Sequence, residues 1–143
     1  MALPEKVVAD ERTIQNFIPQ RPPMVMVGKL HSVSGNKTVT SFIIEKDNLF
    51  CSGNSFREPG LIENIAQTAA AGEGYRASLE GKQPRPGFIG GIKNLHIHDL
   101  PEVNDEIITE ATIEYEVMNA TIIHGKIFNN QAIIAECEMK VFF

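Results

Sequence analysis

One long helix of unusually small residues, predicted over residues 61–79, constrains the fold more than any other feature of the sequence. Its apolar residues recur at helical spacing and form a stripe of Leu61, Ile65, Ala69 and Gly72. Gly72 and Gly74 each cost about 1 kcal/mol relative to alanine in a helix interior. A helix that keeps both glycines is expected to pack against a neighbour that comes very close to its backbone.

Segments of alternating apolar and polar residues precede and follow this helix. They predict strands over 24–33, 37–45, 88–97, 106–117, 121–128 and 132–143. A short amphipathic helix is predicted over 13–18, residues 46–60 read as a loop, and residues 1–10 as a flexible tail. Because 143 residues suit one domain, the single helix must cover the single sheet. We therefore predict one α+β domain over 1–143, with a curved antiparallel sheet wrapped around a central helix.

Composition excludes several classes of protein. With 13 Lys and Arg against 18 Asp and Glu, the net charge of −5 is unlike the basic surface of a nucleic-acid-binding protein, and an anionic membrane would not attract it. The N-terminal residues lack the apolar stretch of a signal peptide. Cys51 and Cys137 have no metal-ligand or disulfide spacing. We expect a cytoplasmic protein with no metal and no cofactor that binds neither nucleic acid nor membrane.

Four stretches of the chain resemble a known family. Residues 17–24, FIPQRPPM, are similar to an opening motif L-L-P-H-R-x-P, and residues 63–67, ENIAQ, are similar to a helix motif E-A-M-A-Q. Residues 87–105 and 129–136 resemble its F-x-x-G-I…P-G-D and D-G-x-x-x-A-E-A segments. On these residues, covering roughly 14–142, the chain resembles the hotdog-fold 3-hydroxyacyl-(acyl-carrier-protein) dehydratases. The resemblance implies the hotdog fold.

The chain departs from this family at two histidines. The family's loop motif G-H-F-P supplies a catalytic histidine, whereas Asn54 follows Gly53 here, and Gln20 replaces the histidine of the opening motif. The shortened loop is similar to a divergent dehydratase-like branch associated with aryl-polyene-type pigment pathways. Proteins of that branch can work beside a second hotdog subunit.

The resemblance implies a site around Glu63. Dehydration needs a base for the α-proton, an acid for the departing hydroxyl and donors to the thioester oxygen. The resemblance implies that Glu63 is the catalytic acid. The alternative is an ordinary acidic residue in the first turn of the helix, where the helix dipole stabilises its negative charge. The N–H groups near Gly60 and Leu61 are candidate donors to the substrate. Gln67 is a candidate catalytic residue because it lies one turn from Glu63.

Asn54 and two strand glycines complete the candidate residues. Asn54 stands at the position of the missing histidine, but an amide cannot act as a base near pH 7, and a turn residue beside Gly53 is the alternative. Gly90 and Gly91 inside a predicted strand indicate a bulge or a close approach. They are expected either to form part of the wall of an acyl tunnel or to pack against the helix of small residues.

The histidines that remain offer little support for other chemistry. His96 and His98 lie two apart on a predicted strand and therefore share a face, as a metal-binding or a surface pair would. No third ligand has a convincing spacing. His31 and His124 lie on other predicted strands and would reach the site only through the fold.

Three functions remain open from the sequence. The first is a dehydratase-like protein that acts on or binds 3-hydroxyacyl thioesters of acyl carrier protein or coenzyme A, in fatty-acid or polyene-type synthesis. The second is a hotdog thioesterase that uses the helix carboxylate, and the third is a non-catalytic acyl-binding subunit. Because one helix leaves a sheet edge uncovered, we expect a homodimer or a heterodimer with a second hotdog protein.

Overall fold

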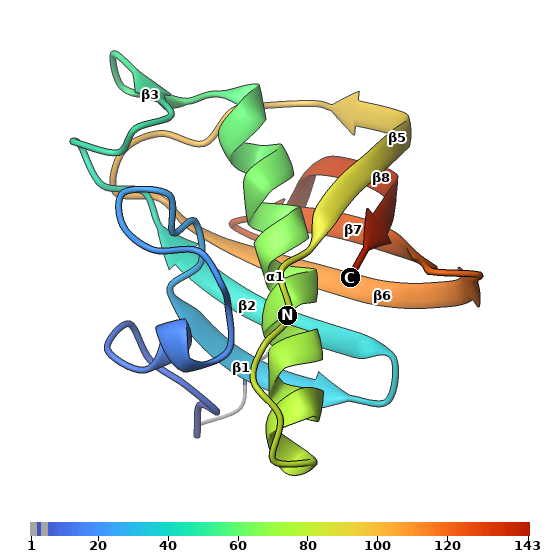
Figure 1. Ribbon diagram of the computed structural model, residues 1–143. Coiled ribbons are helices and arrows are strands. Elements are labelled where there is room, and N and C mark those ends of the chain that lie inside the picture. The colour runs from blue at the N-terminus through green and yellow to red at the C-terminus, as the bar shows by residue number, and fades with distance from the viewer. Residues whose placement is uncertain (1–2, 4–5) are drawn as a thin grey trace.

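Six antiparallel strands curve around one long helix in the computed structural model, which describes residue 3 and residues 6–143 (Figure 1). The helix is α1 (Glu58–Leu79). Across the sheet the strands follow the order β1 (Lys29–Ser34), β2 (Lys37–Ile43), β6 (Glu106–Val117), β7 (Ala120–Asn129), β8 (Ala132–Phe142) and β5 (Phe88–Ile97). A small ribbon of β3 (Cys51–Ser52) and β4 (Ser55–Phe56) precedes the helix, and a short 3₁₀ helix, η1 (Ile14–Asn16), lies near the N-terminus. The predicted α+β architecture is confirmed.

Helix α1 begins earlier than the sequence predicts. Its first residue is Glu58, and Pro59 occupies the first turn, where its missing N–H leaves no bond unmade. At the other end Gly81 has a φ of +71° and Lys82 N–H donates to the Ala77 carbonyl at 2.9 Å, so the predicted glycine cap is confirmed. Within the described residues, no helix has both the length and the apolar character that a membrane crossing requires.

The glycines of α1 allow the close packing that the sequence indicates. A Cβ on Gly72 would overlap the Thr38 side chain on β2. A Cβ on Gly74 would overlap the backbone carbonyl of Phe17, in the segment after η1. One side of the helix is therefore pressed against the sheet and another against the N-terminal segment.

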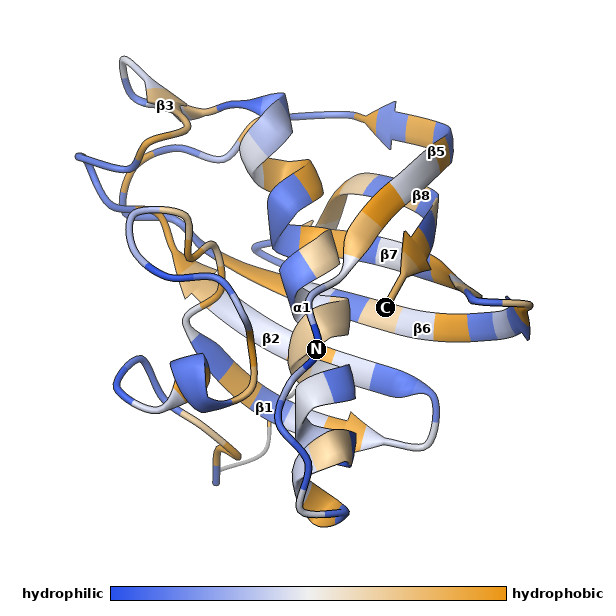
Figure 2. Cartoon of the chain, in the orientation of Figure 1, coloured by the Kyte–Doolittle hydropathy of each residue, from blue (hydrophilic) through white to orange (hydrophobic). Residues whose placement is uncertain are grey.

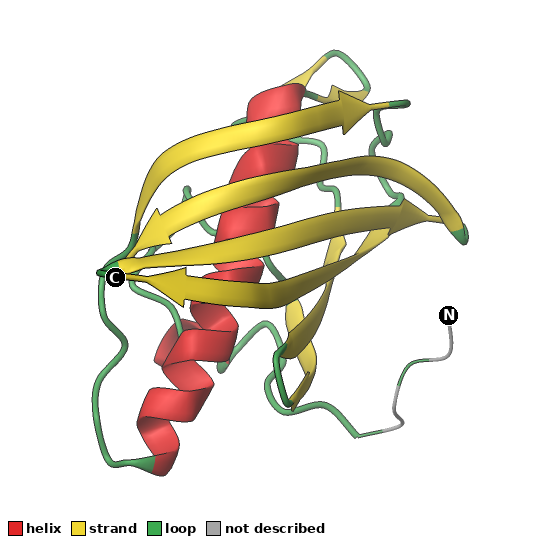
Figure 3. Cartoon of the chain, turned by 90° about the vertical axis from the view of Figure 1, so that its right-hand side faces the viewer, coloured by secondary structure: helices red, strands yellow, loops and turns green. Residues whose placement is uncertain are grey.

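Two apolar clusters make up the core. The larger lies between α1 and the concave face of the sheet, where Leu61 and Ile65 meet side chains of β6, β7 and β8. The smaller joins α1 to the N-terminal segment through Ala9, Ile14, Ile18, Val27, Leu30, Ala70 and Ala71. The view in Figure 3 shows the sheet curving across one side of the helix.

The N-terminal segment pairs with the edge of the sheet. Val8 N–H donates to the Leu30 carbonyl at 2.8 Å, and Leu30 N–H donates to the Ala9 carbonyl at 2.9 Å. Ala9 is 3% exposed. Residues 8 and 9 are thus docked on β1, whereas the sequence predicts that they belong to a flexible tail. Residues 1, 2, 4 and 5 of that tail lie outside the described residues.

The first predicted strand begins only at Lys29, because helix side chains hold the preceding backbone. Met26 N–H donates to Gln67 Oε1 at 2.6 Å, and Gln67 Nε2 donates to the Met24 carbonyl at 2.7 Å. Asn64 Nδ2 donates to the Met26 carbonyl at 2.7 Å. Residues 24 and 26 thus bond to side chains of α1, and only Gly28, whose N–H donates to the Ser41 carbonyl of β2 at 2.9 Å, begins the pairing with the sheet.

Candidate functional site

A cavity of about 210 Å³ lies beside Glu63, between α1 and the β5 side of the sheet. Its lining consists of Gln20, Glu63, Ala66, Ala70, Gly87, Phe88, Ile89, Val141 and Phe143. Most of these side chains are small or apolar. Among the described residues that line the cavity, Glu63 is the one with a titratable side chain. The arrangement suits an apolar chain that carries a reacting group beside one carboxyl.

Gln67 fixes the orientation of the Glu63 carboxyl group. Gln67 is fully buried, and its Nε2 donates to Glu63 Oε1 at 2.9 Å, the contact that their spacing predicts. Because Gln67 Oε1 already accepts from Met26 N–H, the amide cannot turn around without losing that bond. Glu63 Oε1 is therefore held, and no described residue donates to Glu63 Oε2.

Asn64 is a buried polar residue that the sequence analysis does not single out. Besides its bond to the Met26 carbonyl, its Oδ1 accepts from the Thr109 hydroxyl on β6 at 2.5 Å. The Thr68 hydroxyl donates to the Asn64 carbonyl at 2.8 Å and lies 2.7 Å from the Thr40 hydroxyl on β2. The signal was a run of polar residues on the buried face of the helix. Their network ties α1 to the sheet directly beside Glu63.

Gln20 contributes the second polar side chain of the cavity. Its Oε1 is buried, and no described residue donates a hydrogen bond to it. A buried acceptor without a partner costs about 1–3 kcal/mol. The group is therefore ready to accept a hydrogen bond from a molecule in the cavity. The departure from the family's opening motif at this position was the sequence signal for it.

The backbone N–H groups that are predicted to bind the substrate oxygen already donate hydrogen bonds within the helix. Gly60 and Leu61 both donate their N–H groups to the Arg57 carbonyl, at 2.9 and 3.3 Å. The physical reason is the early helix start, which leaves these residues inside the first turn instead of before it. Leu61 is a core residue, and Gly60 packs against the Phe56 ring. Glu63 itself lies beyond the first turn, where stabilisation by the helix dipole is weaker.

Asn54 is not brought to Glu63. It lies at the exposed tip of the β3–β4 ribbon, where its Nδ2 donates to Glu102 Oε2 at 3.3 Å and its carbonyl accepts from Val103 N–H at 2.9 Å. Gly53 has a φ of +61°, as in a tight turn. These contacts favour the alternative stated for Asn54, a turn residue.

The glycines at 90 and 91 form the predicted bulge but not the cavity wall. The register of β5 against β8 shifts between Ile89 and Gly91. A Cβ on Gly90 would overlap the Phe142 ring of β8, and nothing lies within 4 Å of one on Gly91. Neither glycine packs on α1. The cavity wall comes instead from the residues just before them, among them Phe88.

Other reactive side chains lie outside this site. The His96 and His98 rings are parallel, with centroids 6.3 Å apart, so the two share a face as predicted. Burial raises the pKa of the Cys137 thiol to about 11 and also raises the pKa of Cys51, so both thiols stay protonated near pH 7. The described residues include no group of three or more potential metal ligands.

The chain is similar in structure to several solved proteins. A chain of the dehydratase heterocomplex ApeI:P from Xenorhabdus doucetiae matches with a TM-score of 0.79 at 14% identity, covering 90% of this chain and 89% of that chain. The PaaI protein of the E. coli phenylacetic acid degradation operon matches with a TM-score of 0.63 at 12% identity, covering 80% and 81%. A hypothetical thioesterase of Streptococcus pneumoniae TIGR4, solved with coenzyme A, matches with a TM-score of 0.63 at 7% identity, covering 79% and 82%. At these identities the likeness establishes the hotdog fold.

The family is established by sequence. No curated protein matches the chain. The model of the ApeP-like family, described as ApeP dehydratase, matches residues 12–143. This match confirms the resemblance to the divergent aryl-polyene branch and favours a dehydratase-like protein over a thioesterase. The chain belongs to the ApeP-like dehydratase family.

Proposed function

We propose that this protein is the Glu63-bearing subunit of a dehydratase for 3-hydroxyacyl thioesters, completed by a second hotdog chain. The observation that carries the proposal is the cavity beside Glu63. It holds one oriented carboxyl group, one unpartnered amide oxygen on Gln20 and an otherwise small and apolar lining.

The chemistry of dehydration gives Glu63 the role of the acid and leaves the role of the base without a residue. In dehydration a base removes the α-proton, the electrons of that C–H bond form the C=C bond, and the β-hydroxyl leaves as water after it takes a proton. Glu63 carries that proton on Oε2, since Gln67 holds Oε1 as an acceptor. Gln20 Oε1 accepts a hydrogen bond from the substrate hydroxyl. The α-proton needs a base that the described lining does not contain.

The second chain is expected to add along β5. This strand is at the end of the sheet, and two of its residues that line the cavity, Phe88 and Ile89, are 69% and 40% exposed. A chain seated there would cover these side chains and could place its base beside Glu63. A second copy would again carry Gln20 and Asn54 at the family's two histidine positions, so we favour a heterodimer. The Xenorhabdus doucetiae heterocomplex supports this choice.

The carrier of the acyl group is acyl carrier protein or coenzyme A. Both present a phosphopantetheine arm, and one guanidinium lies close to the cavity. Arg85 is 5.8 Å from the centroid of the Phe143 ring in the cavity wall and also pairs with Glu73. Arg85 is thus suitable for the phosphate of that arm. We place the reaction in the cytoplasm, within fatty-acid or polyene-type synthesis.

Mass spectrometry of a 3-hydroxyacyl carrier protein tests the proposal. The protein is incubated with it alone, with a histidine-bearing hotdog partner, and with the same partner after its histidine is replaced by alanine. We expect loss of water only with the intact partner. Release of the free acid by the protein alone would instead identify a thioesterase. Dehydration by the protein alone would show that no partner base is needed.

A further inference from the structure

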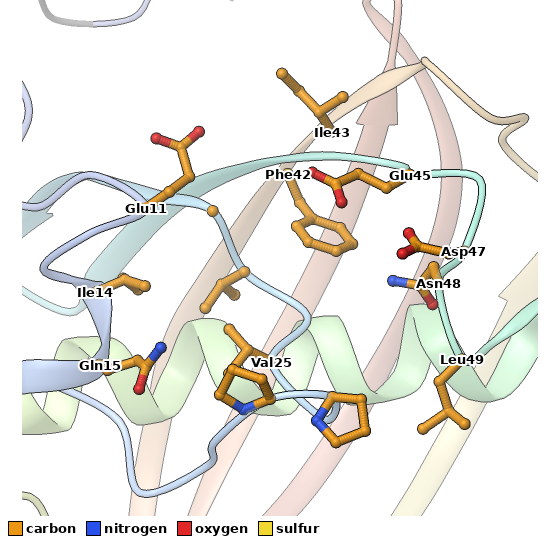
Figure 4. A pocket seen from close by; sticks show the side chains of 14 residues that line it. Glu11, Ile14, Gln15, Val25, Phe42, Ile43, Glu45, Asp47, Asn48 and Leu49 are labelled. Atoms are coloured by element: carbon orange, nitrogen blue, oxygen red, sulfur yellow. The ribbon is translucent and has the colours of Figure 1, made fainter.

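A second groove, of about 430 Å³, shares no lining residue with the Glu63 cavity. It opens between η1, the stretch that leads into β1, and the end of β2 with the loop that follows it. Its apolar lining includes Ile14, Val25 and Phe42. In Figure 4 the Phe42 ring and Val25 lie between Glu11 on one side and Glu45 and Asp47 on the other.

The charged residues among the described lining of this groove are all acidic. Glu11, Glu45 and Asp47 line it, and all three are exposed. None of the three makes an ion pair within the described residues, and the described lining includes no lysine, arginine or histidine. Three uncompensated carboxylates around an apolar floor favour a cationic occupant and repel an acidic one.

The backbone along the groove also offers unused hydrogen-bonding groups. Met24 and Met26 use their backbone groups to bind Gln67 and Asn64 of α1. Val25 lies between them and lines the groove. The N–H and C=O groups of Val25 make no hydrogen bond in the described part of the chain, so they are free to pair with a bound segment.

We propose that this groove binds an extended peptide segment with alternating apolar and basic side chains. The peptide backbone pairs with the free groups of Val25, in the manner of an added strand. Its apolar side chains cover Phe42, and its lysines or arginines face Glu45 and Asp47. The acidic rim excludes an acidic carrier protein from this face, so the site is separate from the proposed acyl site.

Fluorescence anisotropy with a labelled peptide of alternating leucine and lysine tests the proposal. About eight residues, roughly 27 Å when extended, are enough to span such a groove. The double variant Glu45→Gln/Asp47→Asn should weaken binding about tenfold. The matched control, Glu114→Gln/Glu116→Gln, removes two exposed carboxylates of β6 and should change the affinity less than about twofold. Equal melting temperatures would show that both variants are folded.

Two N-methylated peptides test the strand pairing with the unaltered protein. Methyl groups on one alternating set of amides should abolish binding, whereas methyl groups on the other set should leave it intact. Equal binding by both methylated peptides would overturn the proposal. Equal weakening by the control variant, or equal binding of a leucine–glutamate peptide, would overturn it as well.

Discussion

The two edges of the sheet are finished in opposite ways. At β1 the chain covers its own edge, because residues 8 and 9 pair with Leu30 and a bulge shifts the register between Leu30 and Ser32. At β5 no described segment adds a strand, and Phe88, Ile89 and Leu95 are all at least 39% exposed. Hydrophobic bands are visible along β5 at this edge (Figure 2). Both edge strands contain bulges, so the difference lies in the cover: a covered edge is protected from pairing, whereas a bare apolar edge favours it.

The same contrast extends to the two sides of α1 beside these edges. Toward residues 24–26, the side-chain amides of Asn64 and Gln67 are paired with backbone. Toward β5, a cavity remains, and no described residue donates a hydrogen bond to Gln20 Oε1. The amides of α1 that face residues 24–26 are thus satisfied, whereas the cavity on the β5 side keeps a buried acceptor to which no described residue donates. The difference supports the proposal that a partner completes the site beside Glu63.

The largest effect is expected at the bare edge. Ile89→Lys places a charge on β5 beside the cavity, within the proposed interface, and should weaken association with the partner on the order of a hundredfold. Sedimentation of the mixed proteins measures this. Leu79→Lys is the matched control, because Leu79 is 71% exposed at the end of α1. If both variants associate equally well, β5 is not the interface.

On the side of α1 that faces residues 24–26 and the sheet, Asn64→Ala removes two buried hydrogen bonds at once. The Met26 carbonyl and the Thr109 hydroxyl lose their partner, which should cost roughly 2–4 kcal/mol of unfolding free energy. Urea unfolding measures the loss. Gln83→Ala, at an exposed position, should change it by less than about 0.5 kcal/mol. A small effect at Asn64 would mean that the polar network does not hold the segment.

Gly74→Ala tests how tightly the N-terminal segment is pressed on α1. Alanine is the better helix former by about 1 kcal/mol, but its Cβ would overlap the Phe17 carbonyl. We expect a net loss of about 1–3 kcal/mol in urea unfolding. Gly91→Ala, with open space around the position, serves as the control. If alanine at position 74 stabilised the protein, the segment around Phe17 would have to move away from α1 at little cost in free energy.

The smallest effect concerns His31, at the bulge of the covered edge. Burial lowers its pKa below the usual 6.5, although Glu106 and Glu11 oppose the shift, and Lys29 adds to it. The folded state then binds fewer protons than the unfolded state, so stability is lost as the pH falls below about 6.5. His31→Gln should reduce this loss by up to about 1 kcal/mol, measured as melting temperature against pH. An identical pH dependence in both proteins would assign the loss to other groups.

Periodicity was sufficient to predict most of the fold. The alternation over 106–117 gave the bounds of β6, and the glycines of α1 correctly indicated close packing. The helix start was missed because Pro59-Gly60 is also a turn signal, while proline is well tolerated in a first helical turn. The start of β1 was missed because the bonds of Met24 and Met26 go to helix side chains far away in sequence.

The site was only partly predictable. The spacing of Glu63 and Gln67 correctly predicted their contact, because one helical turn is local geometry. The position of Asn54 could not be predicted from its neighbours, since a loop tip is placed by tertiary contacts such as the one to Glu102. That no described residue donates to Gln20 Oε1 could not be predicted either, because it depends on how the segment after η1 lies over the cavity.

The rate of dehydration by the reconstituted complex carrying Glu63→Gln tests the central claim most directly. The substitution keeps the shape of the side chain and removes its proton chemistry. We predict a fall on the order of a hundredfold or more relative to the unaltered complex, the usual scale for a general acid. Binding of a non-reactive acyl analogue should change far less, and Glu80→Gln, on an exposed residue, should leave the rate unchanged. Full activity with glutamine at position 63 would contradict the account.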